Sequence, residues 1–355
     1  MQNKMIGTQS IRFLRPPYII SASSIVGDKE GDGPLGQYFD VIEKDPMCGA
    51  TTWEEAESRF QQKAAELAIQ KAKMKKQDIR YIVAGDLLGQ MIATSFGISS
   101  LQIPLFGVYG ACSTMGESMA IAAMLVEGGY AKHVLALTSS HFASAERQFR
   151  FPSAYGNQRP FASTWTVTGS GAVVLADEEV LSDKEKKDGI RITGITTGKI
   201  TDYGIKDSMN MGACMAPGAC DVIYNHLKDN EIDPSCYDRI VTGDLGVIGK
   251  KILIEMLQAK GYDISKNHMD CGMAIYASDE QKTQAGGSGC GCAAVTLTAY
   301  ILRKLRSGEW KKVLFVPTGA LLSQISFNEG NTVPGIAHGV VLERNEDTGN
   351  GGDLA

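Results

Sequence analysis

Hydrophobic and polar positions follow a helical spacing in some segments and form short apolar runs in others. Residues Trp53 to Ala72 carry an apolar and a charged face, with Thr51 or Thr52 as N-cap, which predicts a long amphipathic helix. The helices that open at Ser113 and Ala293 have almost no polar residues in their first turns. A helix that is apolar all round is buried on every side, so we expect both inside the protein.

Short apolar runs repeat in the same order in the two parts of the chain. The matching pairs are YIVAGDL at 81–87 with RIVTGDL at 239–245, GACS at 110–113 with GCGC at 289–292, and GAVVL at 171–175 with HGVVL at 338–342. Their offsets differ only by the length of loop insertions, which indicates a duplicated architecture. The charged segment Asp177 to Gly189 separates the copies and predicts two halves, residues 1–185 and 186–355.

Each half has the pattern helix, strand, helix, strand, strand. With one fully buried helix per half, the pattern predicts a five-layer α/β/α/β/α sandwich, in which the buried helices form the central layer between two mixed sheets. Further helices cover the outer faces of the sheets.

Composition narrows the class of protein. The chain has 355 residues, of which 43% are hydrophobic, so it can bury a sizeable core. Its net charge of -5 argues against a nucleic-acid partner. The eight cysteines, with no signal peptide pattern at Met1 to Pro17, are typical of reduced cytoplasmic thiols. The longest apolar candidate, Met115 to Val126, is shorter than a bilayer span and predicts no transmembrane segment, and the polar tail from Asn345 is expected to fray.

Cys112 lies between an apolar run and a buried helix, after the small residues Gly110 and Ala111. A thiol at a helix N-terminus faces unpaired N–H groups, which stabilise its thiolate. Cys112 is therefore a candidate pocket residue and nucleophile. The alternative is a small hydrophobic side chain that fills a crowded turn.

Three further residues lie at loops that the duplication brings toward a common crevice. His338, just before the last apolar run, is a candidate base or ligand donor, or else a structural histidine. Asp86 and Asp244 follow matching runs and either line the crevice or cap the next helix.

The polar segment Ser139 to Arg159 contains His141 and several arginines among aromatic residues. A loop of this kind inside a domain is usually functional or interfacial. Arg147, Arg150 and Arg159 either bind carboxylates or lie at a dimer contact or a solvated face.

Metal and nucleotide sites are disfavoured. Cys290 and Cys292 form a CxC pair without the second pair or histidine that zinc requires. The glycine-rich run 286–291 lacks the GK[ST] of a phosphate-binding loop. We expect no metal and no cofactor.

Several segments together carry a resemblance to a known family. They are GACSTMGES at 110–118, SSHFASAERQFRFP at 139–152, TVTGSGAVVLA at 166–176, GDLG at 243–246, AGGSGCGCAA at 285–294 and GIAHGVVLER at 335–344. They resemble the stage V sporulation protein AD (SpoVAD) family, within the superfamily of thiolases and 3-ketoacyl-ACP synthases, over about residues 8 to 344. The resemblance implies a thiolase-like fold and a component of the SpoVA machinery, which moves dipicolinic acid as its calcium chelate during spore formation and germination.

The same resemblance sets out a catalytic pattern that this chain does not complete. Condensing enzymes use a cysteine, a histidine and an asparagine. Cys112 falls at the cysteine position, but Asp244 falls near the histidine position and Ser288 near that of the asparagine. A carboxylate beside the thiol opposes thiolate formation and repels a developing acyl oxyanion.

The leading hypothesis is therefore a non-catalytic protein that binds dipicolinic acid, alone or with calcium, in a degenerate thiolase pocket. The proposed ligand-binding residues are Cys112, His338, His141, Asp244, Ser288 and Asp86. The alternatives are an acyltransferase with Cys112 as nucleophile, and a scaffold that docks membrane partners.

The resemblance also implies partners and a location. We expect contact with other SpoVA membrane proteins, in the cytoplasm of the forespore or spore and peripheral to the spore inner membrane. Thiolase-like proteins usually dimerise through a sheet edge, so we expect a homodimer, with Val134 to Leu137 as the candidate edge strand.

Overall fold

The computed structural model describes residues 4–149 and 159–345, and in this part the two halves repeat one strand order. In the first half the order is β6 (Leu105–Gly107), β5 (Tyr81–Gly85), β7 (His133–Ser140), β9 (Gly169–Ala176) and β3 (Tyr18–Gly27). In the second half it is β12 (His268–Asp270), β11 (Arg239–Thr242), β14 (Lys312–Val316), β16 (Gly335–Arg344) and β10 (Ile190–Thr197). The parallel and antiparallel pairings also match strand by strand. The repeated segments of the sequence therefore occupy equivalent positions in a duplicated sheet.

The two sheets are continuous rather than separate. β3 and β10 pair through only two residue pairs, Ile19 with Ile190 and Tyr18 with Arg191. Beyond them β10 pairs with β2 (Ser10–Arg12), which takes the place of β3. The short junction leaves the rest of each sheet free to face the central helices.

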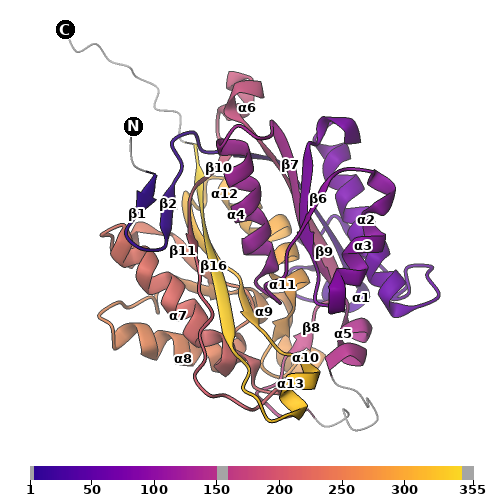
Figure 1. Cartoon of the computed structure of the whole chain (residues 1–355), viewed down its shortest axis with the longest axis vertical. Helices are drawn as coiled ribbons and strands as arrows, with labels where there is room; N and C mark the ends of the chain where they lie inside the picture. The colour runs from indigo at the N-terminus through magenta and orange to yellow at the C-terminus, as the bar shows by residue number, and fades with distance from the viewer. Residues whose placement is uncertain (1–3, 150–158, 346–355) are drawn as a thin grey trace.

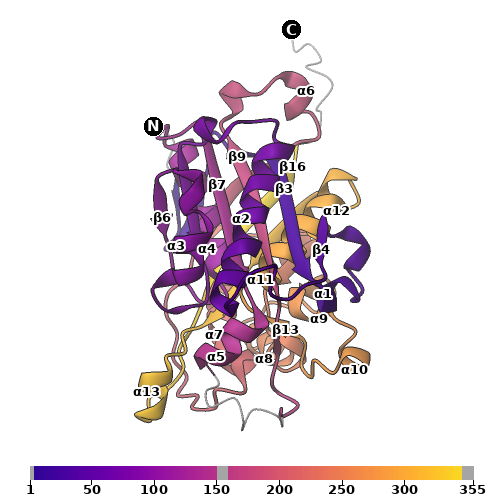
Figure 2. The same ribbon diagram turned by 90° about the vertical axis from the view of Figure 1, so that its right-hand side faces the viewer.

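The outer layers come from amphipathic helices (Figure 1). α2 (Trp53–Lys71) and α3 (Ile92–Gly97) cover the first half, and α7 (Met211–Asp229) and α8 (Gly246–Gln258) cover the second. Figure 2 shows α2 lying across the strands of the first half. The Thr52 hydroxyl accepts a hydrogen bond from the Glu55 N–H at 3.2 Å, which confirms Thr52 as the N-cap of α2.

The central layer consists of α4 (Thr114–Glu127) and α11 (Cys290–Thr296), the latter continued by a π-helical turn, Leu297–Ile301, and α12 (Leu302–Arg306). α4 packs on β5 and β7 of its own half and on β16 of the other, while α11 packs on β7 and β9. Their apolar side chains join one hydrophobic core with both sheets. The predicted layered α/β sandwich with buried apolar helices is confirmed.

Shorter elements complete the described residues. The strands are β1 (Met5–Ile6), β4 (Val41–Glu43), β8 (Trp165–Thr166), β13 (Gly287–Ser288) and β15 (Thr318–Ala320). The helices are α1 (Asp28–Gly31), α5 (Phe142–Phe149), α6 (Asp183–Lys186), α9 (Cys271–Ile275), α10 (Ser278–Gln281) and α13 (Gln324–Asn328). Among the helices of residues 4–149 and 159–345, none has the length and hydropathy of a membrane span. The boundary between residues 185 and 186 remains a prediction, and the tail expected to fray lies almost entirely outside the described residues.

One expectation about the sheet is wrong. Val134 to Leu137 belongs to β7, which pairs with β5 on one side and β9 on the other, so it is not an edge. The apolar composition of a strand does not reveal its position in the sheet, because central strands and exposed edges of an interface are both apolar. The edge of the first half is β6, whose three residues are all exposed.

Candidate functional site

Cys112 lies on a sharp turn between β6 and α4. Ala111, just before it, has a φ of 50°, in the left-handed region that residues other than glycine rarely adopt. β15 passes close to this turn: a Cβ on Gly319 would lie 2.2 Å from the Gly110 carbonyl oxygen. The turn and the close strand together hold the thiol near the start of α4 and almost fully buried.

The group that meets the thiol is a carboxylate. The charge of Asp244, which follows β11, acts on the Cys112 thiol and raises its pKa. The Asp244 carboxylate also accepts hydrogen bonds from the Thr318 hydroxyl at 2.7 Å and from the Gly289 N–H at 3.0 Å. These donors come from β15 and from the start of α11, so both halves of the chain and the central layer build the site.

Burial keeps both groups from ionising readily. Burial, reinforced by the charge of Asp244, raises the pKa of the Cys112 thiol well above its ordinary value. Burial also raises the pKa of Asp244 to about 7, although the hydrogen bonds from Thr318 and Gly289 oppose the rise. The thiol is therefore protonated at neutral pH, despite its place at a helix N-terminus.

The cavity beside Cys112 is small and mostly apolar. Its volume is about 30 Å³, which is close to the space of one water molecule. The lining side chains and backbone come from Leu87, Tyr109, Ala111, Cys112, Ala145, Glu146, Phe149, Thr166, Met211, Ser288, Gly289, Ala320 and Leu322. No lysine or arginine is among these described residues. Of the predicted ligand-binding residues, Cys112 and Ser288 line the cavity, and Asp244 adjoins it through the thiol.

His338 lies on β16 against α4, and it is absent from the cavity lining in the described residues. A Cβ on Gly116 would come within 3.3 Å of the His338 Cβ, one turn of α4 beyond Cys112. The His338 Nε2 atom is buried and has no hydrogen-bond partner among the described residues. Burial lowers the pKa of His338 to about 4, so the ring is neutral at pH 7.

His141 and Asp86 have structural contacts. The His141 Nε2 atom lies 2.8 Å from the Pro46 carbonyl oxygen, and its Nδ1 atom accepts from the Ala143 N–H at 3.1 Å. Both ring nitrogens are therefore used, outside the cavity. The Asp86 carboxylate accepts hydrogen bonds from the Leu88 N–H and from the N–H and hydroxyl of Thr94. These bonds hold the loop that follows β5.

Of the predicted arginines, Arg147 and Arg159 lie within the described residues, and neither lines the cavity. Arg159 forms an ion pair with Glu146 at 2.6 Å, and Arg147 lies 3.4 Å from Glu54. Arg150 lies outside the described residues. Glu146 lines the cavity, and its ion pair with Arg159 puts the positive charge of Arg159 behind Glu146 rather than in the cavity lining.

Several buried groups were not identified from the sequence. Glu57 on α2 accepts hydrogen bonds from the hydroxyls of Ser139 and Ser144, and burial, reinforced by Asp86, raises its pKa. Thr318 and Gly289, which hold Asp244, were also missed. Glu57 lies on the predicted amphipathic helix. The signal that could have identified it is its position as a polar residue on the buried face of that helix.

Within residues 4–149 and 159–345, no three histidine, cysteine or acidic side chains are placed to share a metal ion. The eight cysteines are free, and the Cys290 thiol donates to the Ser139 carbonyl oxygen at 2.9 Å.

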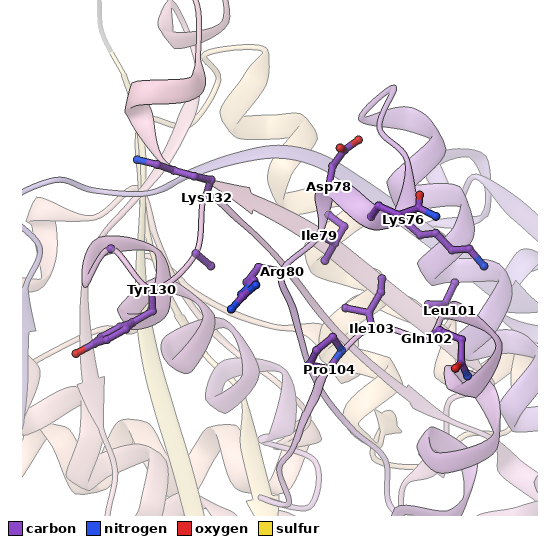
Figure 3. A pocket seen from close by; sticks show the side chains of 13 residues that line it. Lys76, Asp78, Ile79, Arg80, Leu101, Gln102, Ile103, Pro104, Tyr130 and Lys132 are labelled. Atoms are coloured by element: carbon purple, nitrogen blue, oxygen red, sulfur yellow. The ribbon is translucent and has the colours of Figure 1, made fainter.

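A wider groove, of about 600 Å³, opens at the starts of β5, β6 and β7, away from the strand ends that carry the Cys112 turn. Figure 3 shows Arg80 between Tyr130 on one side and Ile103 on the other. The wider groove shares no lining residue with the Cys112 cavity.

Comparison with known proteins identifies the family of the chain. The profile of the family described as "Stage V sporulation protein AD (SpoVAD)" matches residues 7–343. The stage V sporulation protein AD of Bacillus subtilis (strain 168) is 45% identical over 341 residues, covering 96% of this chain and 98% of the relative.

Solved structures show the fold. The 3-oxoacyl-[acyl-carrier-protein] synthase III of Aquifex aeolicus VF5 aligns with a TM-score of 0.54 at 14% identity, over 92% of this chain and 99% of that one. The OleA E117Q variant of Xanthomonas campestris aligns with a TM-score of 0.59 at 14% identity, over 94% and 99%. The fold is thiolase-like, and by its sequence the chain belongs to the stage V sporulation protein AD family.

Proposed function

We propose that the protein is a non-catalytic component of the SpoVA spore machinery that binds dipicolinic acid at the degenerate thiolase site. The observation that carries this proposal is the buried Asp244 carboxylate, which Thr318 and Gly289 hold in place and whose charge raises the pKa of the Cys112 thiol. In a condensing enzyme the groups around the sulfur must favour a thiolate and then stabilise an acyl oxyanion. Asp244 opposes both steps. Membership of a sporulation family supplies the biological setting.

The ligand form that suits this site is the calcium chelate. Free dipicolinate is a dianion, and transfer of a dianion into an apolar cavity without a cation is costly. Calcium neutralises the two carboxylates and has an affinity for a further carboxylate oxygen, which Asp244 offers. Since the cavity is only about 30 Å³, we propose that Phe149 and Met211 move aside when the ligand enters.

Equilibrium dialysis with labelled dipicolinate tests the proposal. We expect saturable binding that is stronger with calcium, and that Asp244→Asn lowers the calcium-dependent affinity at least about tenfold. Cys112→Ala is the matched control, because it removes the thiol and leaves the carboxylate, and it should retain binding. Ala145→Trp, which fills the cavity, should abolish the calcium-dependent binding. Absence of calcium-dependent binding by the folded wild-type protein, or normal calcium-dependent binding by Ala145→Trp, would exclude the cavity as the site.

Acyl transfer predicts a different result in a simple assay. Intact-protein mass spectrometry after incubation with acyl-CoA should show no adduct on the wild-type chain, because the Cys112 thiol stays protonated. A covalent acyl group on Cys112 would overturn the non-catalytic assignment.

Location and partners form part of the proposal. We propose that the protein acts in the cytoplasm of the forespore or spore, on the surface of the spore inner membrane, where other SpoVA membrane proteins hold it. The absence of a membrane-spanning helix in the described residues is compatible with a peripheral role. Co-purification with the SpoVA membrane proteins from spore membranes would test this association.

A further inference from the structure

A second groove, whose lining residues differ from those of the Cys112 cavity, lies at the C-terminal end of α7. α7 ends at Asp229 and leaves the neighbouring ends of β10, β16 and β14 uncovered. The groove has a volume of about 350 Å³, within the range of small-molecule sites. It shares no lining residue with the Cys112 cavity.

Cations dominate the lining of this groove. Arg12, Arg191 and Lys312 contribute three positive charges, and Glu343 is the one acidic side chain among the described lining residues. Glu343 pairs with Arg191 across the β10–β16 register and with Lys312 across the β14–β16 register. The lining therefore has a local excess of two positive charges in a chain of net charge -5.

The single carboxylate satisfies these cations only loosely. The Arg191 Nη2 atom lies 4.0 Å from Glu343, and the Lys312 Nζ atom lies 3.6 Å from it. The Glu343 carboxylate also accepts a hydrogen bond from Thr193 at 3.3 Å. Arg12 contacts Asn230 at 3.5 Å. Well-formed charged hydrogen bonds are about 2.7–2.9 Å long, so the donors of the groove retain capacity for a further acceptor.

Arg191 has an additional free donor. Its Nε atom is buried and has no hydrogen-bond partner among the described residues. A buried unpaired N–H of a charged group is costly, and a bound anion would satisfy it.

The other nearby carboxylate does not compete for the cations. Asp229 accepts hydrogen bonds from the backbone N–H groups of Thr8, Gln9 and Ser10 and from the Ser10 hydroxyl, at 2.9–3.1 Å. Its acceptor capacity is therefore used by the β1–β2 connection. The charge of the groove is available to a ligand.

We propose that this groove binds a compact dianion that carries carboxylate or phosphate groups, held by Arg12, Arg191 and Lys312. The planar guanidinium groups suit the paired oxygens of either anion, and Lys312 adds a point charge. The side chain of Tyr237, over which the Lys312 Nζ atom lies at 5.6 Å, forms an apolar wall beside the charges. The site is separate from the Cys112 cavity and does not depend on the function proposed for it.

Isothermal titration of the full-length protein at low salt in calcium-free buffer tests the site, with dipicolinate and inorganic phosphate as separate probes. We expect Arg191→Gln to weaken binding at the groove at least about tenfold, whichever probe binds. Arg80→Gln is the matched control, since it removes the same charge from the wider groove of Figure 3 and should leave the affinity unchanged. Glu343→Gln removes the competing carboxylate and should tighten binding several-fold.

The outcomes separate the two sites. Binding that is lost in Arg191→Gln but kept in Ala145→Trp assigns the anion to the groove, and the reverse pattern assigns it to the Cys112 cavity and overturns the inference. Equal weakening by Arg191→Gln and Arg80→Gln would show only a response to net charge, and would also overturn it. Should Arg191→Gln fail to fold, an unchanged affinity in Glu343→Gln contradicts the proposal independently.

Discussion

His226 shows how a hydrogen-bond chain defines the proton positions of a buried histidine. The charged Asp229 accepts from the Ser10 hydroxyl, so Ser10 accepts from Thr196 at 2.9 Å. Thr196 must then accept from the His226 Nδ1–H at 2.7 Å, and the His226 Nε2 atom accepts from the Tyr237 hydroxyl. Burial, with the nearby Lys312 charge, lowers the pKa of His226 to about 4. The ring is therefore neutral, and its two nitrogens have fixed roles.

This arrangement predicts acid sensitivity. The pKa of His226 is about 4 in the folded state and near 6.5 in the unfolded chain, so the unfolded state binds the proton first as pH falls. The free energy of unfolding should therefore decrease between pH 6.5 and 4, by up to about 3 kcal/mol from this residue. His226→Gln keeps a donor and an acceptor but cannot titrate, and should lose less stability over that range. Urea unfolding at several pH values measures the difference, and identical pH profiles would refute it.

At the scale of elements, the contact between β15 and the turn before α4 defines the candidate site. Thr318 on β15 donates to Asp244, while Gly319 on the same strand lies against the Gly110 carbonyl. Only a residue without a side chain allows this approach. The sequence pattern predicted the sharp turn at Cys112, but it did not identify the strand that supports it.

Gly319→Ala should therefore destabilise the protein. The new Cβ would lie 2.2 Å from a backbone oxygen, so the strand or the turn must shift, at a cost of about 2–3 kcal/mol. Gly89→Ala is the control, because its Cβ would lie 3.5 Å from the nearest atom, on the Gln148 side chain, and its effect should stay within about 0.5 kcal/mol. Thermal or urea unfolding of both variants tests this, and equal losses would contradict the packing argument.

At the scale of the whole molecule, β6 is the edge strand of the first half, with no strand of the described residues paired on its outer side. Leu105 and Phe106 on this strand are 41% and 46% exposed. Exposed apolar edge strands recruit other strands, and an identical strand from a second copy pairs with itself across a two-fold axis. We propose that a homodimer forms at β6, in place of the edge at Val134 to Leu137 expected from the sequence.

Phe106→Asp should convert the dimer into a monomer, since it places a charge in the interface without disturbing the core. Ile325→Asp on α13, where the side chain is 75% exposed, is the control and should remain dimeric. Light scattering at micromolar concentration measures the mass. A monomeric wild-type protein, or a dimeric Phe106→Asp variant, would show that β6 is not a dimer interface.

The sequence by itself determined the layered α/β class, the duplication, the two buried helices and the position of the Cys112 turn. These follow from local periodicity, from repeated segments and from small residues next to a cysteine, which are properties of short stretches of chain. The similarity to condensing enzymes supplied the expectation that Asp244 lies near the thiol, at the position of their histidine.

Only the tertiary structure decided which polar groups meet. Thr318 and Gly289 come from different segments to hold Asp244 at the site, while His338 and His141 do not line the Cys112 cavity. The edge position of β6 and the grouping of Arg12, Arg191 and Lys312 likewise depend on strand order. Such contacts join residues far apart in the chain, and they depend on register and packing that no local pattern encodes.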